Sequence, residues 1–134
     1  MKRILALLLV LAFCASAVWA APTATITADK KKLNAADSAV LTVTVANDTT
    51  PRTNAVVTYT APAPLTIQSA TGPKIISNQA TATWDGGTAT SNTVYLRVVG
   101  ATQAVAPVGS TVTIPLGDLD PSDSVSATVT VRNP

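Results

Sequence analysis

The sequence predicts an all-β fold: an antiparallel β-sandwich of about seven to eight strands, preceded by an N-terminal signal peptide helix. Thr and Val alternate in short runs such as Leu41–Val45 and Ala127–Val131, and a two-residue period is typical of a strand with one buried face. Gly, Pro, Asn and Asp separate these runs at intervals of roughly 8 to 12 residues, which is the spacing of many short strands. After Ala21 no stretch has helical periodicity.

The first 20 residues have the features of a secretory signal peptide. Lys2-Arg3 forms a short basic start, Ile4–Phe13 is apolar, and Val18–Ala20 places small residues before Ala21, as a signal peptidase requires. We therefore predict a signal peptide at 1–20 and a single domain at 21–134. The protein is expected to be exported to the cell surface or the extracellular space, with the periplasm as a further possibility.

Two alternatives to this cleavage stay open. The segment from Ile4 to Ala21 lacks charge and approaches the roughly 17 to 25 apolar residues that span a bilayer, so the uncleaved precursor could remain anchored in the membrane. The second alternative is lipoprotein processing at Cys14, which the bulky Phe13 before it disfavours.

The alternation defines eight candidate strands, each with one apolar side that we expect to face the core. In chain order the expected inward residues are Ala24, Ile26 and Ala28; Leu41, Val43 and Val45; Ala55, Val57 and Tyr59; Leu65 and Ile67; Ala80, Ala82 and Trp84; Val94, Leu96 and Val98; Val112, Ile114 and Leu116; and Val125, Ala127, Val129 and Val131. Most opposite sides carry Thr, which suits a solvated surface.

Turns are expected wherever Gly, Pro, Asn and Asp gather. They fall at Asn34–Asp37, Asn47–Pro51, Ala61–Pro64, Gly72–Pro73, Asp85–Gly87, Pro107–Gly109 and Gly117–Asp123. Because Pro cannot donate to a sheet ladder, Pro62 and Pro64 are expected at a strand end or on an edge. Lys30–Lys32 is expected to be a solvated turn, with contact to an anionic surface or polysaccharide as the alternative.

The composition of residues 21–134 argues against an enzyme. They contain no His, Cys or Glu, the side chains on which most nucleophilic, acid–base and transition-metal chemistry depends. Seven Lys and Arg balance seven Asp, so we expect no basic patch for nucleic acid. No small-molecule substrate is expected, and Cys14 leaves with the signal peptide, so the domain is expected to have no disulfide.

Asp118, Asp120 and Asp123 form the one acidic cluster and are the candidate metal ligands, because carboxylates and loop carbonyls are the oxygen ligands of Ca²⁺. The alternative is a tight turn in which Asp side chains accept backbone hydrogen bonds. Among the aromatic residues, strand parity leaves only Tyr95 outside, where a ring can stack on a sugar. Asn47-Asp48-Thr49 is an N-glycosylation sequon in an expected loop.

Two stretches carry a family resemblance. Asp37–Asn47 is followed by Asn54–Tyr59 and Pro64–Ile67, and Leu116–Pro121 leads into the Thr/Val strand of Ser122–Val131. They resemble the Ig-like conserved-repeat domains of bacterial and archaeal surface proteins, labelled "domain of unknown function eleven", and the related bacterial cell-adhesion-related domain. This resemblance implies an Ig-like sandwich with structural, adhesive or assembly roles at the cell surface, and no catalytic residues.

The sequence thus leads to two functional hypotheses. The first is a non-enzymatic, exported structural module that associates with itself or with other surface proteins. Its segment Ala21–Ala28 either forms the first strand of its own domain or adds to the open sheet edge of a neighbour, as in pilus-like filaments. The second is a module that binds Ca²⁺ or carbohydrate through the Asp118–Asp123 loop and Tyr95.

Overall fold

The computed structural model describes residues 21–134, which form nine strands and no helix. The strands are β2 (Thr23–Ala28), β3 (Ser38–Ala46), β4 (Arg52–Thr60), β5 (Thr66–Asn78), β6 (Thr81–Trp84), β7 (Gly87–Thr90), β8 (Val94–Ala104), β9 (Thr111–Leu119) and β10 (Ser124–Arg132). This part of the chain holds no helix long and apolar enough to cross a membrane. The expected signal peptide and Cys14 lie outside the described residues.

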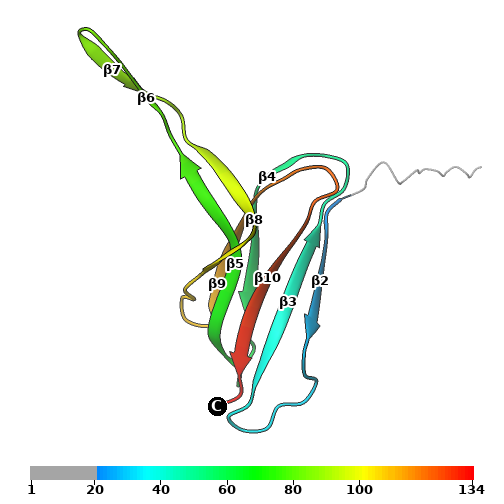
Figure 1. The fold of residues 1–134 in the computed structure, drawn as a ribbon. Helices are drawn as coiled ribbons and strands as arrows, with labels where there is room; N and C mark the ends of the chain where they lie inside the picture. The colour runs from blue at the N-terminus through cyan, green and yellow to red at the C-terminus, as the bar shows by residue number, and fades with distance from the viewer. Residues whose placement is uncertain (1–20) are drawn as a thin grey trace, which may run out of the picture.

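Two antiparallel sheets form the body of the domain (Figure 1). The larger sheet has the order β2-β3-β10-β5-β8, and the smaller one pairs β4 with β9. Every strand pair is antiparallel. The predicted all-β, sandwich-like architecture is therefore confirmed.

The core lies between the two sheets and comes mainly from β9 and β10. It contains Val112, Ile114 and Leu116 from β9 with Val125, Ala127, Val129 and Val131 from β10. The sequence predicts all of these as inward residues, because both strands alternate strictly. The prediction is confirmed because each of the two strands has the other sheet packed over its apolar side. The predicted inward residues Val43 and Val57 belong to the same cluster, together with Ala39, Ala70 and Leu119, which the alternation does not single out.

Gly72-Pro73 lies inside β5 rather than at the turn that the sequence predicts. β5 is 13 residues long and contains an irregularity in its pairing with β8 between Pro73 and Lys74. A Cβ atom at Gly72 would lie 2.4 Å from Cγ2 of Ile114 in the opposite sheet. Glycine at position 72 permits close approach of the two sheets. The predicted turn is therefore wrong, and this glycine is explained by packing between the sheets.

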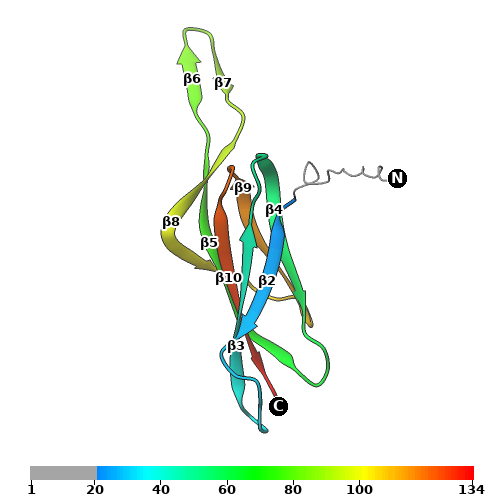
Figure 2. The same ribbon diagram turned by 90° about the vertical axis from the view of Figure 1, so that its right-hand side faces the viewer.

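Residues 76–96 form a projection that we call the arm (Figures 1 and 2). It contains the end of β5, the β6-β7 hairpin and the start of β8, and all its residues are exposed except the half-buried Gly87. Trp84 pairs with Gly87 across the two-residue turn Asp85-Gly86, where Gly86 has φ of 102°. The hairpin turn predicted here is confirmed, because only glycine readily adopts this backbone conformation.

Part of the predicted core is wrong, because several of the expected inward residues are exposed on the arm, on β8 and on β2. Trp84 and Leu96 are 56% and 55% exposed, and Val94 and Val98 are also exposed. Ala80 and Ala82 lie in the arm as well, and Ala24 and Ile26 are exposed on β2. Alternation shows that one side of each strand is apolar, but no second sheet covers these strands, so the apolar side stays in solvent.

Candidate functional site

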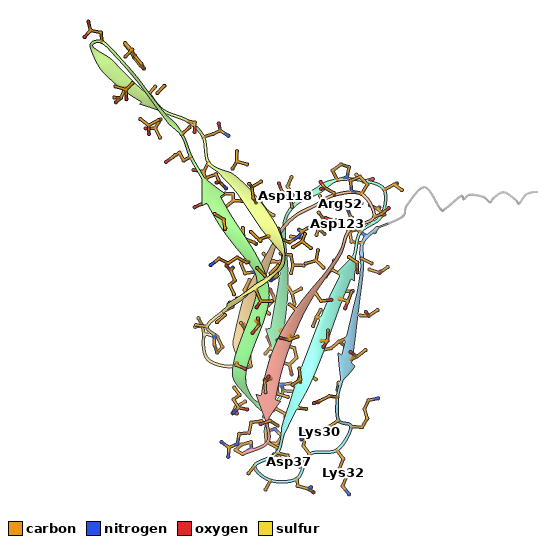
Figure 3. The ribbon with its side chains drawn as sticks, in the orientation of Figure 1. Lys30, Lys32, Asp37, Arg52, Asp118 and Asp123 are labelled. Carbon is orange, nitrogen blue, oxygen red and sulfur yellow. The ribbon has the colours of Figure 1, made fainter. Side chains whose placement is uncertain are left out.

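The predicted acidic cluster lies where β9 passes into β10, and Figure 3 labels two of its members, Asp118 and Asp123. Arg97 of β8 contacts this cluster. The Asp123 carboxylate pairs with the Arg97 guanidinium at 2.5 Å and accepts the main-chain N–H of Asp120 at 2.9 Å. Arg97 also donates to the carbonyls of Leu116 and Asp118. The loop is therefore held by its own hydrogen bonds and by an arginine from the neighbouring strand.

Two of the three candidate metal ligands, Asp118 and Asp123, have hydrogen-bond partners within the protein. Asp118 accepts the main-chain N–H of Asn54 at 2.9 Å, while Asp123 is paired with Arg97. In the part of the chain that the structure describes, no three His, Cys, Asp or Glu side chains gather to hold a metal ion. The loop matches the alternative of a turn stabilised by side-chain to backbone bonds.

Asn47 joins the same loop to the end of β3. Its side-chain amide donates to the carbonyls of Thr50 and Asp120 at 2.9 Å and of Leu119 at 3.3 Å. This amide nitrogen is the atom that N-glycosylation would modify. Since three carbonyls already hold it, Asn47 serves as a structural clamp in the folded domain, which the sequon alone does not reveal.

Hydrogen bonds lower the pKa of two carboxyl groups in this region. The Asp120 N–H contributes most to the lowered pKa of Asp123, followed by the Arg97 side chain. The Thr50 N–H is the main cause of the lowered pKa of Asp48, which also pairs with Arg52 at 2.9 Å. Both carboxylates are therefore favoured in the ionised form, as expected of structural anchors.

A groove of about 440 Å³ lies between the small sheet and the base of the arm. It brings together Tyr95 and Asp118, two residues that the sequence associates with sugar binding. Its lining includes the apolar Val56, Ile75 and Pro115, the aromatic Tyr95, and the polar Asn54 and Asp118. Asp120 and Asp123 do not line it. An aromatic ring beside polar groups is a common arrangement for a small ligand.

The arm is the second surface with functional potential. Between Lys74 and Arg97 its one charged residue is Asp85, at the tip. Its exposed large apolar side chains are Ile76, Trp84, Val94, Tyr95 and Leu96. So many exposed apolar side chains in one projecting element make the arm a candidate interaction site.

Searches against protein-family models, curated proteins and solved structures find no match to this chain. The resemblance to Ig-like surface domains therefore stays a prediction from the sequence.

Proposed function

We propose that this chain is a non-enzymatic, exported structural module of the cell surface or extracellular matrix, with an Ig-like sandwich, that associates with itself by strand addition. The observation that carries the proposal is the arm. An isolated two-stranded ribbon is marginally stable in water, and this one exposes a tryptophan, a tyrosine and several aliphatic side chains. Burial in an assembly would remove that surface from water and stabilise the ribbon.

Open sheet edges supply the second requirement of strand addition. Within residues 21–134, β2 pairs with β3 alone and β4 pairs with β9 alone. The segment Thr23–Ala28 thus pairs in its own domain, which is one of the two arrangements that the sequence allows. Its outer edge, like that of β4, leaves main-chain groups free to pair with another strand.

Low charge supports the same proposal. Residues 21–134 carry no net charge, so long-range repulsion between copies is weak. Edge strands are commonly protected against pairing by charged side chains, yet β2 and the paired strands β6 and β7 contain none.

Light scattering and negative-stain microscopy of the chain beginning at Ala21 test this function. We expect the mass to rise with concentration and elongated assemblies to form. Leu96→Asp, which places a charge on the arm, should reduce the mass, whereas Thr113→Asp on the exposed face of β9 should not. A monomer at every concentration would contradict the proposal.

The groove favours a second candidate function, carbohydrate binding. Tyr95 is 61% exposed and lies beside Asn54 and Asp118, so its ring is free to stack on a sugar whose hydroxyls bond to the polar pair. Calorimetric titration with a panel of glycans tests this. Tyr95→Ala should abolish binding, and Leu96→Ala, on the opposite side of the same strand, should leave it intact. Absence of heat with every glycan would exclude this candidate.

A further inference from the structure

The small sheet is too narrow to cover the large one, and β2 is among the strands that it leaves uncovered. Ile26 lies directly opposite Val43 in the β2-β3 register, so the two side chains share one face of the sheet. Val43 is 8% exposed in the core, whereas Ile26 is 55% exposed. Ile26 therefore points to the core side of the sandwich but has no second layer over it.

The free edge of β4 borders the same uncovered region. β9 is the strand of the small sheet that contacts β5 and β8, at one side of the large sheet. β4 therefore lies on the other side of β9, toward β3 and β2. We call this region the slot: its floor is the inner face of β2 with the half-buried Leu41 and Val45 of β3, and its wall is the edge of β4. Figure 2 shows β2 in front, with β4 behind it and to its right.

The dimensions of the slot match a two-stranded ribbon. The small sheet has two strands against five in the large sheet, so a ribbon beside β4 would widen it to four. The strands β6 and β7 have four residues each, about 13 Å, and β2 has six, about 20 Å. The hairpin is therefore long enough to cover Ile26 and most of β2.

The charges at the ends of ribbon and slot are complementary. Asp85 at the arm tip is the one charged residue of the arm. The exposed Lys30–Lys32 turn directly follows β2 at one end of the slot (Figure 3). Asp29 and Asp37 flank this turn, but each accepts a main-chain N–H, from Val40 and Asn34 respectively. The turn thus keeps an excess of one positive charge for an incoming carboxylate.

We propose that the arm of a second copy of this chain fills the slot, with Trp84 packed over Ile26, the ribbon paired to β4 and Asp85 beside Lys30–Lys32. The inference rests on the proposed self-association and specifies its interface. The arm points away from its own sandwich (Figures 1 and 2), so its receptor is another molecule. Arm and slot are different surfaces of one chain, and such contacts either close into a ring or continue as a filament.

Trp84 provides a direct readout, because it is the single tryptophan of residues 21–134. In the chain beginning at Ala21, its emission should shift to shorter wavelength over the same concentration range in which the mass rises. An apolar neighbour replaces water around the ring in the docked state. A rise in mass with unchanged Trp84 emission would overturn the arm–slot contact while leaving self-association intact.

Complementation of two defective variants is the sharper test. Trp84→Asp impairs the arm and Ile26→Asp impairs the slot, so each alone should be monomeric, with an unchanged far-ultraviolet circular dichroism spectrum showing that it is folded. Mixed together, the intact arm of Ile26→Asp and the intact slot of Trp84→Asp should form a one-to-one complex. Val99→Asp is the matched control, because Val99 is also exposed but lies on β8, at the opposite edge of the large sheet from β2 and outside the arm, and it should assemble normally.

The remaining outcomes separate the two levels of the proposal. Assembly that survives both Trp84→Asp and Ile26→Asp would overturn the arm–slot contact and leave the proposed function standing. Two folded monomeric variants that fail to combine would also overturn it, because independent damage to one shared surface gives that result. A wild-type chain that stays monomeric, with Trp84 emission typical of an exposed ring at all concentrations, would overturn both.

Discussion

Ile114 and Leu96 show how differently two inward-predicted residues contribute to stability. Ile114 is fully buried between the sheets, whereas Leu96 is more than half exposed on the arm. We expect Ile114→Ala to lower the free energy of unfolding by about 2 to 5 kcal/mol, because it leaves a cavity. Leu96→Ala should cost less than about 1 kcal/mol. Urea denaturation of the monomeric protein measures both, and equal losses would contradict the arrangement of the sheets.

The ionisation of Asp123 makes the stability of the fold depend on pH. Because folding lowers the pKa of this carboxyl below its ordinary value of 3.8, its ionised form stabilises the folded state at higher pH. That contribution is lost as the pH falls through the lowered folded pKa. We therefore expect Asp123→Asn to be less stable than wild type at neutral pH, with the difference shrinking below pH 3.8.

Denaturation curves at a series of pH values measure this effect. Asp85→Asn at the arm tip is the matched control, since it removes the same charge without breaking the ion pair to Arg97. A constant stability difference between wild type and Asp123→Asn across the acid range would show that the ionisation of Asp123 is not coupled to folding.

Residue types in the sequence indicate chemistry only until the neighbours are known. Asp118, Asp120 and Asp123 have the composition of an oxygen ligand set. However, the Asp123 carboxylate pairs with Arg97, which lies 26 positions earlier in the chain, and the Asp118 carboxylate accepts a hydrogen bond from Asn54. Nothing local to the loop predicts these partners. The pairing of Tyr95 with Asp118 in one groove is likewise a result of the topology, although the exposed side of Tyr95 follows from strand parity.

The arm should be dispensable for folding, because it contributes no residue to the core cluster. Replacing Gln79–Thr93 by a two-residue Asn-Gly turn removes β6 and β7 and keeps the antiparallel β5-β8 pair, in which Asn78 lies opposite Val94. We expect the free energy of unfolding of the monomer to change by less than about 1 kcal/mol and self-association to be lost. Denaturation and light scattering of the same sample check both, and unfolding of the shortened chain would contradict this.

Strands that meet a second sheet are predictable from alternation, and strands that do not are only half predictable. β9 and β10 alternate and are buried as expected. The arm strands alternate equally well, because the two-residue period reports which residues share a face, not whether anything lies over it. The same limit explains Ile26: its face is predicted correctly, and its exposure follows from the width of the opposite sheet.

The position at which the mature chain starts determines how β2 is presented. Removal of the first 20 residues leaves two residues before β2 begins at Thr23, so cleavage before Ala21 keeps every described strand intact. Val18 and Ala20 are the small residues that a signal peptidase requires. We therefore expect intact-mass analysis of the native protein to give a chain beginning at Ala21.

The same measurement bears on assembly. A retained leader would hold the N-terminal end of β2, and with it one end of the slot, at the membrane surface. A cleaved chain presents both the slot and the arm to solvent and can extend in either direction. A native mass that includes the first 20 residues would therefore indicate an anchored module and not a free filament. Extraction without detergent would then recover little protein for light scattering. Recovery of the processed chain in soluble assemblies is the expected result.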